Sequence, residues 1–149
     1  MKGKSLLAAL IALGIFSGSA YAAPSFKQSG NKFTINEGAD DAAVQALKGA
    51  DMTKLALTLN NVKDVDLQKV CAAVPELRTL NIENSEELTS IAPVAGLKKL
   101  TVFTLSAEKV KDFSPLANCE KLKKLTYYAV KEADFSTLGA LKQIVELNG

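Results

Sequence analysis

The sequence contains no histidine. Histidine is the usual general base near neutral pH and the commonest metal ligand, so its absence removes the Ser-His and Cys-His nucleophile pairs. No glycine-rich phosphate loop or calcium-loop spacing is visible either. The clustered acidic residues stand in polar segments typical of solvated turns; they are Asp64, Asp66, Glu83, Glu86 and Glu87. The sequence therefore predicts a non-enzymatic protein with no catalytic residue, no cofactor and no metal site.

The chain also lacks net charge once its first residues are set aside. Its 18 Lys and Arg stand against 16 Asp and Glu. Residues 1–22 contain two lysines, Lys2 and Lys4, and no acid, so the remainder is neutral. A neutral chain gives no electrostatic reason to expect a nucleic-acid partner or an anionic membrane partner.

Residues 1–22 have the organisation of a secretory signal peptide. The two lysines precede an apolar run at 6–16, and the small-residue motif Ala20-Tyr21-Ala22 follows it. The alternative is an uncleaved anchor, but that run is too short for a spanning helix of about 20 residues. We expect cleavage after Ala22 and an exported protein, periplasmic or extracellular, with no stable membrane anchor left.

Two stretches near the C-terminus are close copies of each other. DFSPLANCEKLKKL runs from Asp112 to Leu125, and DFSTLGALKQIVEL follows 22 residues later, from Asp134 to Leu147. At this offset, apolar residues from Phe103 onward fall on apolar residues. A run of matches at one fixed period predicts a solenoid, in which each unit buries its apolar face only by stacking on its neighbour. The alternative is a common α/β domain whose leucines share this spacing by accident.

The phrase L-x-x-L-x-L occurs four times, with starts 25, 23 and 22 residues apart. The copies are Met52-x-x-Leu55-x-Leu57, Leu77-x-x-Leu80-x-Ile82, Leu100-x-x-Phe103-x-Leu105 and Leu122-x-x-Leu125-x-Tyr127. This pattern resembles the leucine-rich repeat proteins, and Ile91-Ala92-Pro93-Val94 and Phe113-Ser114-Pro115-Leu116 are most similar to the bacterial internalin type. The resemblance implies an α/β solenoid: a right-handed coil with a parallel sheet on its concave face and short helices or irregular turns on its convex face.

The expected organisation is a signal peptide at 1–22, an N-terminal cap at 23–51 and about four repeats at 52–149. In the cap, 31–35 alternates like a strand, and Asp40 can start a helix over 41–48 that ends at Gly49. In the repeats, Asp66 can cap a helix over 67–73, Ser114 one from Pro115 and Ser136 one from Thr137. In the family, an asparagine three residues past the last strand leucine ties the backbones of successive turns together. Asn60 matches this position, and Asn84 could serve if the longer second repeat is shifted in register.

Two cysteines in an exported chain raise the question of a disulfide. Cys71 and Cys119 each follow the second strand leucine of their repeat by 14 residues, so they hold the same place two coils apart. Two coils separate α-carbons by at least about 9.6 Å, beyond the bridging limit of about 7 Å. We expect two buried apolar thiols and favour this over a redox pair.

The concave strand face is the expected ligand site, because leucine-rich repeat proteins usually bind there. Alternation predicts three columns of outward residues: Lys54, Thr79, Val102 and Lys124; Ala56, Asn81, Thr104 and Thr126; Thr58, Glu83, Ser106 and Tyr128. The resemblance implies a protein or peptide partner, with Tyr128 as the aromatic anchor. The same columns are also consistent with a solvated sheet face. An alternative function is self-assembly through the final strand at 145–149, whose outer edge would be free to pair.

Overall fold

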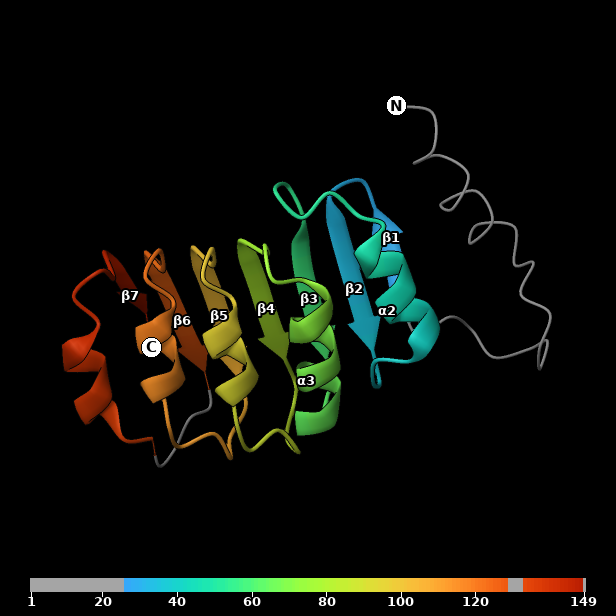
Figure 1. Ribbon diagram of the computed structural model, residues 1–149. Helices are drawn as coiled ribbons and strands as arrows, with labels where there is room; N and C mark the ends of the chain where they lie inside the picture. The colour runs from blue at the N-terminus through green and yellow to red at the C-terminus, as the bar shows by residue number, and fades with distance from the viewer. Residues whose placement is uncertain (1–25, 129–132, 149) are drawn as a thin grey trace.

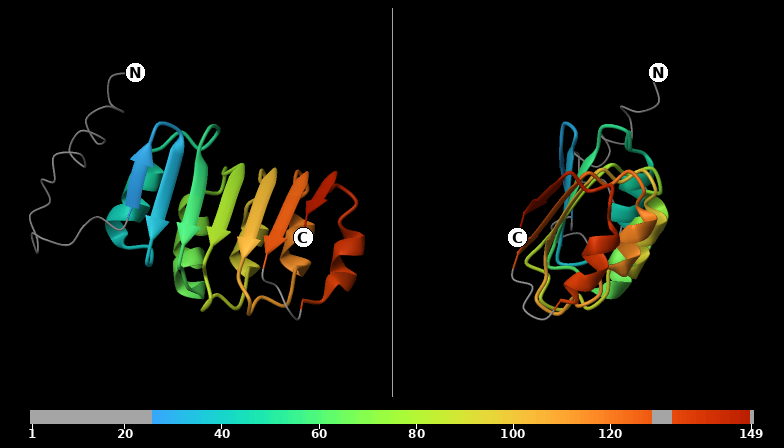
Figure 2. Two further views of the ribbon diagram at one scale, coloured as in Figure 1. Left: turned by 180° about the vertical axis from the view of Figure 1, so that it is seen from behind. Right: turned by 90° about the vertical axis from the view of Figure 1, so that its left-hand side faces the viewer.

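The structure is a computed structural model that describes residues 26–128 and 133–148, so the predicted signal peptide lies outside the described residues. Seven strands form one sheet in chain order, and the helices cover one of its faces (Figures 1 and 2). The strands are β1 Phe26–Ser29, β2 Lys32–Asn36, β3 Ala56–Asn60, β4 Thr79–Glu83, β5 Val102–Ser106, β6 Lys124–Tyr128 and β7 Glu146–Asn148. The helices are α2 Asp41–Lys48 and α3 Asp64–Ala73, followed by the 3-10 helices η1 Ala92–Gly96, η2 Ser114–Asn118 and η3 Phe135–Ala140.

Every neighbouring pair of strands from β2 to β7 is parallel, and only β1 runs antiparallel to its neighbour β2. From β2 to β6, each strand is followed by a turn, a short helix and a second turn that leads into the next strand (Figure 1). This arrangement is a coil repeated along the chain. The predicted α/β solenoid with a parallel sheet on one face and short helices on the other is confirmed.

The N-terminal end of the solenoid is a hairpin and a helix. The strand expected at 31–35 is β2, and the helix expected over 41–48 is α2, whose first turn is capped by Asp40 accepting from the Ala43 amide at 2.7 Å. Strand β1 was not predicted. Phe26 stacks on Phe33 with ring centroids 5.2 Å apart, and this contact closes the end of the core.

Helix α3 begins at Asp64, two residues before the predicted cap. The Asp66 carboxylate lies in the first turn of the helix, where it accepts from the Lys63 amide at 3.0 Å and the Ala39 amide at 3.0 Å. The prediction identified the right carboxylate but gave it the wrong place, because a side chain at the third helical position can also satisfy free amides.

Aspartates, not the predicted serines, accept hydrogen bonds from the first backbone amides at the helices of the repeated DFS phrase. Asp112 accepts from the Ser114 amide at 2.8 Å, and Asp134 accepts from the Ser136 amide at 2.9 Å. Asp112 and Asp134 also form a parallel bridge between their two coils. The phrase recurs because each 22-residue coil must turn at this point, and an Asp two residues before an amide makes that turn.

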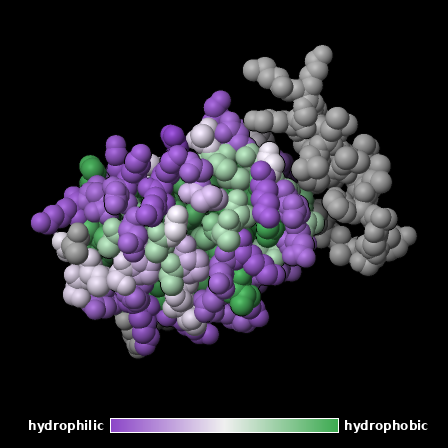
Figure 3. Space-filling model, in the orientation of Figure 1, coloured by the Kyte–Doolittle hydropathy of each residue, from purple (hydrophilic) through white to green (hydrophobic). Residues whose placement is uncertain are grey.

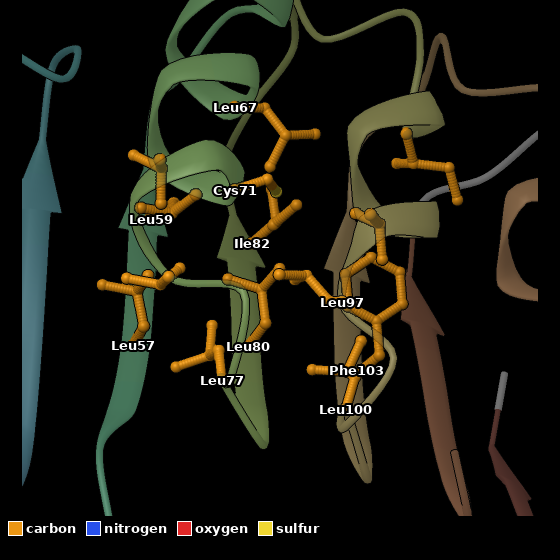
Figure 4. Packing of buried hydrophobic residues seen from close by; sticks show 14 of the residues in the cluster. Leu57, Leu59, Leu67, Cys71, Leu77, Leu80, Ile82, Leu97, Leu100 and Phe103 are labelled. Atoms are coloured by element: carbon orange, nitrogen blue, oxygen red, sulfur yellow. The ribbon is translucent and has the colours of Figure 1, made fainter. Parts of the chain in front are cut away.

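The core is a continuous stack of leucines and phenylalanines between the sheet and the helices (Figure 4). Each coil contributes two strand residues that point inward, such as Leu80 and Ile82 of β4. Phe103 and Phe113 are fully buried and fill the middle of the stack. Since each layer packs on the layers beside it, burial in one coil depends on the presence of its neighbours.

The first repeat is displaced by two residues from its predicted register. Leu57 pairs with Leu80, and Leu59 pairs with Ile82, so β3 is one leucine further along than the phrase Met52-x-x-Leu55-x-Leu57 placed it. The family's asparagine position is therefore occupied by Val62 in this coil, not by Asn60.

The turn after β4 places Ser85 inside the solenoid. Its hydroxyl accepts from the Val62 amide at 3.1 Å and donates to the Glu83 carbonyl at 2.9 Å. Ser85 is fully buried. It thus bridges two successive turns, which is the task that the family's asparagine performs.

Asn60 has a different role on the outside of the turns. It donates to the Asn36 amide oxygen at 3.2 Å, and Asn84 donates to Asn60 at 3.0 Å. Positive φ angles occur at Glu37, Asn61 and Asn84, next to this stack. Because a left-handed residue redirects the chain sharply, these positions turn the first three parallel strands toward the helix face in the same way.

Candidate functional site

The sheet face opposite the helices carries three aligned columns of side chains. Strand pairing aligns them residue by residue across β2 to β7. The first column is Lys32, Ala56, Thr79, Val102, Lys124 and Glu146. The second is Thr34, Thr58, Asn81, Thr104, Thr126 and Asn148. The third is Asn36, Asn60, Glu83, Ser106 and Tyr128.

Of the twelve residues predicted to line this face, eleven lie in the columns and Lys54 does not. Lys54 lies in the turn before β3, where its amide donates to the Asp51 carbonyl at 3.2 Å. The two-residue slip in the first repeat explains the error, since it moves Ala56 into the first column and Thr58 into the second. The strands expected at 31–35 and 145–149 were not counted among the columns, but β2 and β7 extend the columns at both ends.

The middle of the face is polar but uncharged. Thr58 and Asn81 are hydrogen-bonded across their strands at 3.4 Å, and the second column contains only threonine and asparagine. Tyr128 is 57% exposed, whereas Thr126 is 6% exposed. An exposed tyrosine beside small polar side chains offers a partner both apolar area and hydrogen bonds.

An ion pair stands at the C-terminal end of the first column. Lys124 Nζ lies 2.7 Å from Glu146 Oε1, and Asn148 donates to the same oxygen at 2.9 Å. The hydrogen bonds from Lys124 and then Asn148 lower the pKa of the Glu146 carboxyl from its usual value. Both charged groups are exposed to solvent, so this pair contributes little to stability and is available to a ligand.

The other face has a depression of about 410 Å³ between α3 and η1, lined in part by Asp64, Val65 and Gln68. Asp64 is already saturated there, because its carboxylate accepts from the Thr89 amide at 2.8 Å, the Thr89 hydroxyl at 2.6 Å and the Ser90 amide at 3.1 Å. The carboxylate therefore serves to hold the next coil. Among the described residues, no group of His, Cys, Asp or Glu side chains is placed to hold a metal ion.

Cys71 and Cys119 are free, buried thiols. Burial, with a smaller contribution from Cys119, raises the pKa of the Cys71 thiol to about 12. Burial alone raises the pKa of the Cys119 thiol to about 11. The Cys119 thiol donates to the Val94 carbonyl at 3.3 Å, across one coil. Thiols with such pKa values carry almost no thiolate at neutral pH, so they have the character of core residues.

No protein-family model matches the sequence, and no curated protein matches it. Solved structures do match it. The helix order, the parallel sheet and the 22- to 23-residue coils define a leucine-rich repeat solenoid.

Two of the matching structures are internalins of Listeria monocytogenes. Internalin C2 superposes with a TM-score of 0.59 at 20% identity, covering 79% of this chain and 60% of that one. An internalin designated inlF gives a TM-score of 0.53 at 22% identity, covering 76% of this chain and 38% of that one. The fold is thus of the internalin type, and this chain spans less than two thirds of either structure.

No helix in the described part of the chain has both the length and the apolar character that a membrane crossing needs.

Proposed function

We propose that the chain is an exported, non-enzymatic binding module that recognises a protein or peptide through the three columns of its exposed sheet face. The observation that carries this proposal is the unbroken register of β2 to β7, which holds one polar surface of fixed spacing. The absence of histidine from the sequence also favours binding over catalysis. The likeness in fold to internalins supports the same class by analogy.

The size of the face limits what it can hold alone. Six strands at about 4.8 Å, each about five residues long at about 3.3 Å, give about 450 Å². A stable protein interface covers about 800 Å² on each partner. The face therefore suits an extended peptide or a protein that also contacts the neighbouring turns.

The test is substitution of the two side chains at opposite ends of β6, Lys124→Ala and Tyr128→Ala, with a matched control on the far face. Val65→Ala on α3 removes a side chain that is 61% exposed, comparable to Tyr128 at 57%. We expect the double variant to lose capture of a partner from cell-surface or periplasmic extract while Val65→Ala retains it. Equal capture by the native chain and the double variant would refute binding through this face.

The second candidate is assembly through β7. Leu147 is 51% exposed, although its partner on β6, Leu125, is fully buried, and Val145 is 84% exposed. Another strand added beside β7 would cover Leu147 and pair with the edge of β7 that faces away from β6. If this edge pairs two copies, Leu147→Lys yields a monomer by light scattering where the native chain yields a dimer; a native monomer at all concentrations refutes it.

A further inference from the structure

The charges of the protein are segregated between the two rims of the sheet, although the chain is nearly neutral. We define the amino rim as the turns at 97–101, 119–123 and 141–145, which lead into β5, β6 and β7. These turns contain one acid, Glu120, and five lysines: Lys98, Lys99, Lys121, Lys123 and Lys142. The equivalent turns before β3 and β4 are balanced, with Lys54 and Arg78 against Asp51 and Glu76, so the excess of positive charge lies at the β5 to β7 end. Figure 3 shows hydrophilic side chains projecting along the margin where these strands begin.

The opposite rim, where the strands end, is acidic. We define this carboxyl rim as residues 37, 61–66, 84–90, 107–112 and 133–134. It contains the lysines Lys63, Lys109 and Lys111, and the acids Glu37, Asp64, Asp66, Glu86, Glu87, Glu108, Asp112 and Asp134. The net charge of the whole chain therefore describes neither the positive amino rim nor the negative carboxyl rim.

The two rims act independently on a partner. A strand of about five residues separates them by about 16 Å. At physiological ionic strength the screening length is about 8 Å, so a surface close to the amino rim feels little of the carboxyl rim. The neutrality of the whole chain does not cancel the local positive potential.

The backbone fixes the lysines of the amino rim in rows. The Lys123 amide donates to the Thr101 carbonyl at 2.9 Å, and the Val145 amide donates to the Lys123 carbonyl at 2.8 Å. Within each turn the same bond recurs, as in the Leu100 amide to the Leu97 carbonyl at 3.1 Å. The turns of the rim are thus stacked at strand spacing, and their side chains project from one flat margin.

Most of these lysines are not used inside the protein. Lys99 forms an ion pair with Glu76. Within the residues that the structure describes, no ion pair involves Lys98, Lys121, Lys123 or Lys142, and all four are exposed. They contribute positive potential without stabilising a neighbouring coil.

We infer that the amino rim is a docking surface for an anionic lipid bilayer. Lysine is a hydrated point charge that suits diffuse attraction, and the three turns of the rim carry no arginine to clamp a phosphate with two hydrogen bonds, the nearest being Arg78 in the turn before β4. It also has no aromatic side chain on which a nucleic-acid base could stack. A flat anionic surface needs neither, because it meets every lysine of a flat margin at once.

The same segregation fixes the orientation of the bound protein. An anionic surface attracts the amino rim and repels the carboxyl rim, so the strands stand upright on the bilayer. The exposed sheet face then points sideways, along the surface. Tyr128 and its neighbours stay open to a partner in this orientation, and lipid binding is independent of partner binding.

Vesicle sedimentation tests the inference with the chain from Ala23, which retains every residue of the described fold and lacks the apolar run at 6–16. The rim variant is Lys98→Gln, Lys121→Gln and Lys123→Gln together. The matched control is Lys27→Gln, Lys69→Gln and Lys109→Gln together, which removes the same charge from exposed sites outside the amino rim. Circular dichroism confirms that both variants fold.

We expect the native chain to sediment with vesicles of phosphatidylcholine and phosphatidylserine, and not with phosphatidylcholine alone. Each rim lysine removed weakens binding about fivefold, so the rim variant binds about a hundredfold less and the control nearly as well as the native chain. Raising the salt to about 1 M abolishes binding. Equal losses in both variants overturn the inference, and so does binding of the native chain to soluble dextran sulfate but not to anionic vesicles.

Discussion

The hydroxyl of Ser85 is the most informative single group to remove from the structure. It is fully buried and accepts from the amide of Val62, which is itself 1% exposed. Ser85→Ala leaves that amide without its partner in the interior. A buried donor without a partner costs about 1–3 kcal/mol, and the cavity left by one oxygen is too small to hold a water molecule.

The expected result is a loss of about 2 kcal/mol in the free energy of unfolding. For a domain of this size the loss lowers Tm by about 7 °C. Urea unfolding followed by circular dichroism measures the change as a shift of the midpoint at constant m-value.

The control is Ser90→Ala, which removes a hydroxyl of the same kind at an exposed site. Ser90 accepts from the Ala92 amide at 3.2 Å, and water can replace it there. We expect a change below about 0.5 kcal/mol. If Ser85→Ala is as stable as Ser90→Ala, then the bridge between the two turns contributes nothing, and the proposed equivalence to the family's asparagine is wrong.

Two further predictions concern titratable groups. Burial raises the pKa of the Asp64 carboxyl, but hydrogen bonds from Thr89 and Ser90 outweigh this and hold the pKa below its usual value. The stabilisation is present above the unfolded pKa of about 3.9 and is lost as the pH falls through the lower folded pKa. The unfolding free energies of the native chain and of Asp64→Asn, measured from neutral to acid pH, should therefore converge at the acid end. A difference that stays constant with pH would contradict this origin. Ellman's reagent at neutral pH should label neither Cys71 nor Cys119 in the folded protein and both after denaturation; rapid labelling of the folded form would show that the thiols are accessible.

The sequence predicted the architecture well because the same apolar spacing recurs in each copy of the repeat, so each copy supports the assignment made from the others. The 22-residue offset relates Lys124 to Glu146 and Leu125 to Leu147 in the strand pairing, as the two DFS phrases implied. Helix α2 was also predicted to the residue, since Asp40 caps its first turn and Gly49, a poor helix former, follows its last residue.

The register of the first repeat could not be predicted in the same way. Leu55, Leu57 and Leu59 alternate, so a slip of two residues keeps every leucine on the inner face. Local pattern cannot distinguish the two registers, and only pairing with Leu80 selects one. The misplacement of Lys54 among the ligand residues follows directly from this ambiguity.

Two other features depend on long-range contacts that the sequence does not display. Strand β1 has one buried apolar residue, Phe26, and is defined by its pairing with β2. The charged rims were missed for another reason. Summed along the chain, the lysines and acids cancel, and only the coil, which returns every 22 or 23 residues, collects each sign on its own side.

Because the turns are stacked at equivalent positions, a coil can be added to this solenoid without changing its fold. Residues 101–122 form one complete coil, and the described parts of the next repeat, 123–128 and 133–144, are bonded to it at equivalent backbone positions. A second copy of 101–122 inserted after Leu122 would meet the same two surfaces that the original copies present to each other. Such a duplication lengthens the sheet by one strand and the amino rim by one turn. The length of the rim along a surface can therefore change in fixed steps while the fold stays the same.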